Sequence, residues 1–322
     1  MQAHRTYRKS VAIGLGVLVL VGVELVARLV LGLGDPPIYV ADPQIEYMLK
    51  PDQDVMRFGS HVFVNHWGMR PPDFPLHKTK PDEIRVLIMG DSVINGGSEI
   101  DQGLLSTTLL QQNLQEKLGR PVVIGNASAG SWGPGNWLAY VQRYGFFDAD
   151  LVVLLVNSGD YADNPTYAPL SANHPVSKPL LATQEAIFRY LPGYLPTFSS
   201  QPAAQVTTIS PAEVAQGRTD LSQFLTLAKD NGARQVMVFH HPDRPEFLSG
   251  KYLTGHDEMR ALSRELGVSF TDLYPAYAKQ SDNLYRDGIH HNVKGQKVLS
   301  DALYDALLSQ LRPGVPIATA SS

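Results

Sequence analysis

Short apolar runs alternate with helical segments from residue 85 onward, and this alternation constrains the fold more than any other feature. The runs have the length of buried strands, and the run at 151–156 is unbroken, which is typical of a parallel strand covered on both faces. We therefore predict a three-layer α/β/α domain over 84–312, with a mostly parallel, open, flavodoxin-like sheet. The predicted strands are 85–89, 121–124, 151–156, 235–239 and 268–270, and the predicted helices are 104–118, 136–144, 221–228, 257–266 and 293–311.

Two short motifs lie at the ends of these predicted elements. Gly90-Asp91-Ser92 directly follows the first strand, and Asp287-Gly288-Ile289-His290 precedes the last helix. A serine, a histidine and an aspartate can supply a nucleophile, a base and an orienting acid. Ligands bind beyond the carboxyl ends of parallel strands, so we expect Ser92, Asp287 and His290 to be catalytic residues at that edge. Taken alone, Ser92 also fits a turn or a helix cap.

With these motifs, residues 84 to about 311 resemble the SGNH/GDSL hydrolase superfamily. Gly90 to Gly96 matches the first family block, GDS-x-x-x-G, and Asp287 to His290 matches the fourth. The resemblance implies ester hydrolysis or acyl transfer through an acyl-serine, with neither a metal nor an organic cofactor.

The second and third family blocks bear on the oxyanion hole, and here the chain departs from the pattern. The second block, at 126–130, implies that the N–H of Gly130 joins that of Ser92. The third block usually has Gly-x-Asn-Asp, but this chain has Asn157-Ser158-Gly159-Asp160. Either Asn157 donates from two positions earlier, or the hole relies on backbone groups alone.

Three further residues are candidates for substrate contact. Trp132, Asp160 and His241 all follow predicted strands. Trp132 could stack on a sugar or be buried against the sheet. His241 could contact substrate, bind a metal with Asp243 or stabilise a turn, and we predict no metal site. His291 should point away from the triad as a structural or surface residue.

The N-terminal segment 11–33 is almost wholly apolar and long enough to cross a bilayer. Glu24 and Arg28 interrupt it and can pair one helical turn apart. Basic residues precede the segment, so the positive-inside rule predicts an inner-membrane, single-pass signal anchor with a cytoplasmic N-terminus and a periplasmic catalytic domain. A cleaved signal peptide is the alternative.

The remaining segments complete the predicted domain organisation. We expect a basic cytoplasmic tail at 1–10, a membrane-proximal stalk at 34–83 with one hairpin near 55–65, an inserted cleft-cover loop at 161–219 and a flexible tail at 313–322. A surface decoration or a docking loop is the alternative for the insertion.

Composition excludes several classes of function. The net charge of −4 and the lack of a basic stripe speak against nucleic-acid binding, and the absence of cysteine excludes disulfides and a thiol nucleophile. By resemblance, we expect a membrane-anchored esterase or O-acetyltransferase acting on an acylated polysaccharide, with a multi-span acyl-donor partner if it transfers. The alternatives are a lipid esterase or lysophospholipase, and a catalytically weak domain that binds glycan in a synthesis complex.

Overall fold

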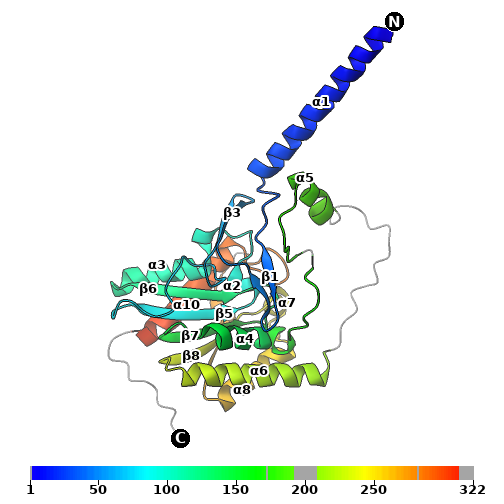
Figure 1. The fold of residues 1–322 in the computed structure, drawn as a ribbon. Helices are drawn as coiled ribbons and strands as arrows, with labels where there is room; N and C mark the ends of the chain where they lie inside the picture. The colour runs from blue at the N-terminus through cyan, green and yellow to red at the C-terminus, as the bar shows by residue number, and fades with distance from the viewer. Residues whose placement is uncertain (1, 172, 192–208, 281–282, 312–322) are drawn as a thin grey trace.

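The computed structural model describes residues 2–171, 173–191, 209–280 and 283–311. The predicted tail at 313–322 and residues 192–208 of the predicted insertion lie outside the described residues. A long helix projects from an α/β body in Figure 1, and the chain then builds two small hairpins before it enters the central sheet.

The central sheet confirms the predicted α/β fold. In the described part of the chain it has five parallel strands in the order β6-β5-β7-β8-β9. Every residue of β5 and β7 is buried. The β7 sequence is wholly apolar, and Arg85, the one charged residue of β5, pairs with Glu83. The strands are β5 (Ile84–Gly90), β6 (Val122–Ser128), β7 (Leu151–Val156), β8 (Gln235–His240) and β9 (Ser269–Asp272).

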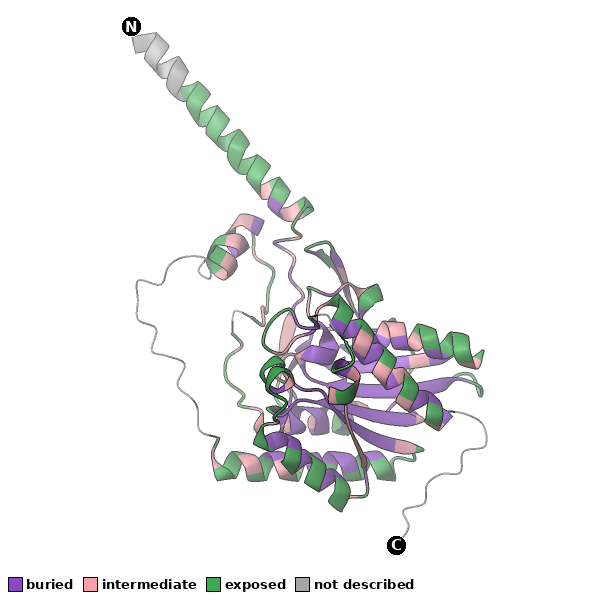
Figure 2. Cartoon of the chain, turned by 180° about the vertical axis from the view of Figure 1, so that it is seen from behind, coloured by how far each residue is buried: buried purple, intermediate pink, exposed green. Residues whose placement is uncertain are grey.

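Helices cover both faces of this sheet and complete the three layers (Figure 2). Leucines of α3 and α10 pack on one face, and apolar residues of α4, α6 and α8 pack on the other. The helix α6 begins ten residues before its predicted start, because Ser210 and Glu213 form a capping box at its N-terminus. The bounds are α3 (Ser106–Leu118), α4 (Pro134–Tyr144), α6 (Pro211–Asp230), α7 (Arg244–Ser249), α8 (Thr254–Glu265), α9 (Tyr274–Tyr277) and α10 (Val293–Leu311).

The segment after the apolar helix forms two antiparallel hairpins, where the sequence predicted one. Hairpin β3–β4 is the predicted one, whereas β1–β2 was missed. Ile45 and Tyr47 are buried in the main core, and the Trp132 indole donates to the Tyr47 carbonyl at 2.8 Å. This segment therefore packs on the α/β domain instead of forming a free stalk. Its strands are β1 (Tyr39–Asp42), β2 (Glu46–Leu49), β3 (Gln53–Arg57) and β4 (Ser60–Val64).

The N-terminal apolar segment is one helix, α1 (Gln2–Leu29). Its stretch Ser10–Leu29 has a mean hydropathy of 2.4, and only 6% of it is buried, so by length and composition it can span a membrane. The end of α1 contacts α5 (Ala182–Glu185), which continues as a π-helical turn at Ala186–Tyr190. Two distant parts of the chain thus meet where α1 joins the body (Figure 1).

Candidate active site

Ser92 is held at the carboxyl edge of the sheet by a tight strand-to-helix connection. Strand β5 ends at Gly90, Asp91 caps the next helix by accepting the Val93 N–H at 2.8 Å, and Ser92 is the first residue of α2 (Ser92–Asn95). A Cβ on Gly90 would lie 2.7 Å from the Leu155 carbonyl oxygen, so only glycine fits there. This local geometry explains why the motif needs a glycine before the acid and the serine.

The structure brings Ser92, Asp287 and His290 together in one hydrogen-bonded series. The His290 Nε2 lies 2.8 Å from the Ser92 Oγ, and the His290 Nδ1 lies 2.8 Å from an Asp287 oxygen. With the proton of the imidazole on Nδ1, the ring donates to the carboxylate and its Nε2 can accept the serine proton. The arrangement is that of a nucleophile, a general base and an orienting acid.

The carboxylate of Asp287 is held ionised by its surroundings. Burial alone would raise the pKa of Asp287, but the backbone N–H groups of Ile289 and His290 and the His290 ring lower this pKa to about 2. The two N–H groups reach the same oxygen, at 3.0 and 2.8 Å. Asp287 can therefore stabilise a charged imidazole across the neutral pH range.

Asn157 is committed to two buried carboxylates. Its Nδ2 donates to Asp91 at 2.9 Å and to Asp160 at 2.7 Å, and its Oδ1 accepts the Gly159 N–H at 2.6 Å. Burial raises the pKa of Asp91 to about 6 and that of Asp160 well above its ordinary value. Burial and mutual repulsion disfavour the ionised forms of Asp91 and Asp160. The Asn157 amide stabilises both carboxyl groups by donating a hydrogen bond to each.

Of the three predicted oxyanion donors, Ser92, Gly130 and Asn157, the Asn157 side chain is not available to donate. Both N–H groups of the Asn157 amide are in use, against the expectation that this side chain could donate to an oxyanion. Ser92 begins a helix, where first-turn N–H groups have no partner within the helix, and Gly130 lines the same cavity. The Tyr47 hydroxyl donates to the Gly130 carbonyl, which belongs to the peptide that follows the one carrying the Gly130 N–H. In this conformation an oxyanion would rely on backbone groups.

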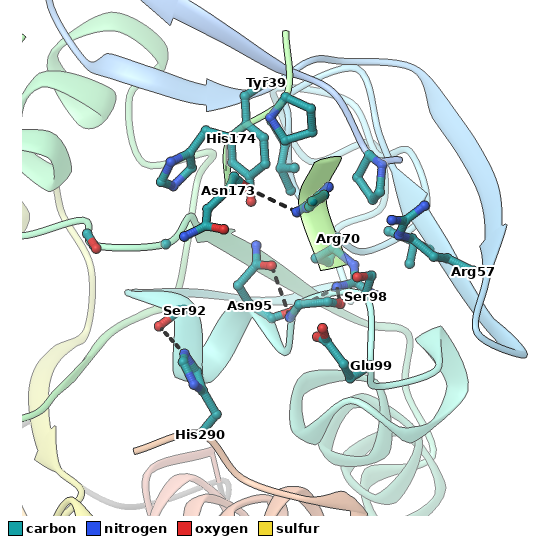
Figure 3. A pocket seen from close by; sticks show the side chains of 18 of the residues that line it. Tyr39, Arg57, Arg70, Ser92, Asn95, Ser98, Glu99, Asn173, His174 and His290 are labelled. Carbon is teal, nitrogen blue, oxygen red and sulfur yellow. Dashed lines mark hydrogen bonds between the residues drawn. The ribbon is translucent and has the colours of Figure 1, made fainter. Parts of the chain in front are cut away.

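A cavity of about 360 Å³ opens beside the serine. Figure 3 shows Ser92 and His290 on one side of it and the side chains of Tyr39 and His174 across from them. Its walls mix polar and apolar groups and come from the hairpins, from the loop after α2 and from the described part of the insertion. The polar lining residues include Tyr39, Arg57, Arg70, Asn95, Ser98, Glu99, Asn173, His174, Arg189 and Arg286.

A second cavity, of about 430 Å³, reaches the Ser92 and His290 side chains from another direction. Ser92 and His290 line both cavities. The second one is acidic, because Asp91, Asp160 and Asp163 lie on its wall, and burial raises the pKa of Asp163 to about 6. Two chemically different approaches therefore meet at one serine.

The other predicted contacts are divided between cavity and interior. Asp160 lies on the second cavity, whereas Trp132 is 1% exposed and packs in the core, away from both cavities, so of its two predicted alternatives the structure has burial. His241 is fully buried and lines neither cavity, so substrate contact, one of its three predicted alternatives, is not what the structure has. His291 is also buried, and burial lowers its pKa to about 3. The ends of the predicted strands and helices indicate where these residues lie in the fold. Whether each side chain can contact substrate depends on its burial, which the sequence does not give.

The sequence missed most of the first cavity wall. Arg70, Tyr39 and Asn173 come from three segments without a recognisable motif. Only Asn95 carried a signal, since it follows Ser92 by one helical turn. Among the described side chains, no group of three histidines or carboxylates is placed to hold a metal ion.

The chain is similar to known proteins in structure. No protein-family profile matches the chain, and no curated protein matches it. Several solved structures are similar to it at low sequence identity. TesA is 17% identical, with 70% of this chain and 99% of TesA covered and a TM-score of 0.47. A lipase/acylhydrolase from Enterococcus faecalis is 14% identical, with 72% and 100% covered and a TM-score of 0.45. The acetyl xylan esterase AlAXEase is 15% identical, with 70% and 100% covered and a TM-score of 0.45.

Proposed function

We propose that this protein is a serine esterase or O-acetyltransferase that acts on acyl esters of a cell-surface or secreted polysaccharide. The hydrogen-bonded series Ser92–His290–Asp287 carries the proposal, because it joins a hydroxyl, an imidazole and a carboxylate in the order that nucleophilic catalysis needs. The serine also lines two cavities, so an ester can approach it.

The proposed reaction has two steps. The Ser92 Oγ attacks the ester carbonyl while the His290 Nε2 takes the hydroxyl proton, and backbone N–H groups of Ser92 and Gly130 stabilise the oxyanion. The tetrahedral intermediate collapses, the alkoxide leaves with the proton from His290, and an acyl-serine remains. His290 then deprotonates water or a sugar hydroxyl, which attacks the acyl-serine and releases a free acid or a new ester.

The lining of the first cavity favours a small acyl group on a polar molecule. Tyr39 and Asn173 offer hydrogen-bonding groups of the kind that bind sugar hydroxyls. A lipid esterase would need an apolar channel for a long chain beside Ser92. We therefore rank a lipid substrate below a glycan.

Transfer and hydrolysis differ only in the acceptor. Two cavities at one serine would allow a donor and an acceptor to occupy different sides. In that case an acyl donor must be supplied on the same side of the membrane, and we propose a multi-span membrane protein as its source.

We further propose that α1 is an uncleaved, single-pass anchor of the inner membrane, with its N-terminus in the cytoplasm and the catalytic domain in the periplasm. The apolar, exposed stretch Ser10–Leu29 supports the anchor. Protease added to intact spheroplasts should degrade the catalytic domain. A domain protected from external protease would contradict this topology.

Full-length protein in detergent would test the chemistry. Wild type, Ser92→Ala and Ser309→Ala would be compared on 4-nitrophenyl acetate, 4-nitrophenyl octanoate and acetylated xylan. Ser309 is an exposed serine of α10 that lines neither cavity, so Ser309→Ala is the matched control. We expect acetate release that Ser92→Ala abolishes and Ser309→Ala retains.

The substrate series separates the alternatives. Turnover that rises from acetyl to octanoyl would instead favour a lipid esterase. If folded wild type releases acetate from none of the three esters, hydrolysis is excluded for them. Acetyl transfer to a glycan in membranes that retain the donor would then be compared between wild type and Ser92→Ala. Equal transfer by both would leave a non-catalytic, glycan-binding role.

A further inference from the structure

A strongly apolar surface lies on the insertion, beside the point where α1 joins the body. We call α5 and its π-helical continuation, Ala182–Tyr190, the insertion helix. Large apolar side chains project from it and from its two flanks, and Phe188 is 75% exposed. Ile187, Phe188 and Leu191 are three and four residues apart at the end of this helix and lie on one side of it, whereas Leu180 and Leu181 precede its first residue. The exposed residues are Leu180, Leu181, Ile187, Phe188 and Leu191.

The N-terminus of the insertion helix is fixed to α1 by charged side chains. The Glu24 carboxylate accepts the N–H groups of Ala182 and Thr183 at 2.8 and 2.9 Å and the Thr183 hydroxyl at 2.8 Å. Arg28 pairs with Glu24 at 2.6 Å and donates to the Leu180 carbonyl at 2.6 Å. These contacts explain why Glu24 and Arg28 interrupt an otherwise apolar segment.

The buried side of the insertion helix is fixed to the body through Glu185. This carboxylate accepts the Gly34 N–H at 2.7 Å and pairs with Arg57, and it lies 3.3 Å from Arg189. Glu185 is only 6% exposed. Glu185 thus fixes one side of the insertion helix to the protein, while Ile187 and Phe188 face outward beside the exposed Gln184.

The contact with α1 sets the depth of this apolar surface. Glu24 lies five residues before the end of α1 at Leu29, which corresponds to roughly 7 Å along a helix axis. Interfacial helices bury their apolar face about 5–10 Å into the boundary between headgroups and acyl chains. If α1 spans a bilayer, the start of the insertion helix lies at that level.

Apolar surface continues between the two helices. A shallow groove of about 510 Å³ runs between α1 and the insertion helix, with Val19, Val23 and Ala186 on its walls. One apolar surface therefore extends from the proposed span onto the insertion.

We propose that the insertion helix lies in the lipid interface beside α1 and gives the protein a second membrane contact. The proposal rests on the proposed anchor, and its occupant is the bilayer itself. Arg189 of the insertion helix also lines the cavity at Ser92. The second contact therefore fixes the active-site cavity next to the membrane surface, where the catalytic domain cannot rotate freely about a single anchor.

Single cysteine labels test this proposal, because the chain has no cysteine. Phe188→Cys, Val19→Cys and Leu227→Cys would be labelled with bimane in full-length protein and reconstituted in nanodiscs whose lipids carry doxyl groups at a shallow position, for residue 188, and at a deep position, for residue 19. The label at Val19 tests whether α1 lies in the bilayer. Leu227 on α6, which is 40% exposed, is the control for a residue in water. Each variant would first be required to keep the wild-type Tm.

We expect doxyl lipid to quench the labels at 188 and 19 about twofold more strongly than the label at 227, because an interfacial side chain lies among the quenchers. Quenching at 19 with none at 188 would overturn the interfacial helix and leave the anchor intact. Quenching at neither position would overturn the anchor as well. A label at 188 that is shielded from water but not quenched by lipid would assign this surface to a protein partner and also contradict the proposal.

Discussion

The His290 Nε2 lies 2.8 Å from the Ser92 Oγ, although 198 positions separate the two residues. Ser92 is fixed by the strand-to-helix connection at the end of β5, whereas His290 stands in the loop before α10. Their contact therefore depends on correct closure of the whole domain. Both ring nitrogens of His290 are used, one toward the nucleophile and one toward Asp287.

Asp287→Asn should lower kcat by roughly 10³- to 10⁴-fold with little change in KM, because an amide no longer selects the imidazole tautomer whose Nε2 is free. Steady-state kinetics on 4-nitrophenyl acetate measure this loss. Asp301→Asn removes an exposed carboxylate paired with Lys297 and should keep wild-type kcat. Equal activity of both variants would exclude Asp287 from the mechanism.

Asn157→Ala should destabilise the protein more at pH 8 than at pH 5. The substitution removes the shared donor of two buried carboxylates, which costs on the order of 1–3 kcal/mol. The pKa of Asp91 is raised to about 6, so its folded form takes up a proton as the pH falls below that value. The ionised acid that needs the amide is then no longer present, and the difference in stability shrinks.

Urea unfolding of wild type and Asn157→Ala at both pH values measures this effect. If Asn157 served mainly as an oxyanion donor, kcat would fall about 10²- to 10³-fold with no loss of stability. That outcome would contradict the structural role that the hydrogen bonds indicate.

The sequence predicts the catalytic series well because its determinants are local. The apolar run before Gly90 places Ser92 at a strand end. Asp287 and His290 belong to one stretch of four consecutive residues, so their side chains can meet without help from the rest of the fold. Parallel strands then bring these ends to one edge without further information. The triad geometry thus follows from motifs and topology.

The rest of the site depends on packing that local patterns do not encode. Tyr39 reaches the cavity only because its hairpin packs on the domain, and nothing in the proline-rich segment distinguishes such packing from a free stalk. The role of Asn157 depends on how deeply Asp91 and Asp160 are buried, which their positions after strands do not reveal. Trp132 is likewise placed by the β1–β2 hairpin that covers it.

Arg70→Lys should destabilise the loop that follows α2. The buried guanidinium donates to the carbonyls of Asn95 at 2.8 Å and Gly97 at 2.7 Å, and one ammonium cannot replace all of its donors. Losing these bonds costs about 1–3 kcal/mol for each group left unpaired. Urea midpoints would show the loss, whereas Arg218→Lys, at an exposed pair with Glu265, should change little. Equal midpoints for the two variants would contradict this role.

His291→Leu should remove part of the acid sensitivity of the fold. His291 is 1% exposed, and both of its ring nitrogens lack a hydrogen-bond partner within the described part of the chain. Burial lowers its pKa in the folded state to about 3, whereas an unfolded histidine titrates near 6.5. Between these values the unfolded chain binds the extra proton, so this group reduces stability as the pH falls, by up to about 1.4 kcal/mol per pH unit.

The free energy of unfolding, measured in urea from pH 7.5 to pH 4.5, tests this prediction. His291→Leu should lose less stability than wild type over that range, and the two curves should run parallel above about pH 7, where neither state binds the proton. His66→Leu is the control, because that histidine is exposed beside Asp52. If the wild-type and His291→Leu curves stay parallel down to pH 4.5, His291 does not titrate differently on unfolding and its neutral, buried state is not a source of acid lability.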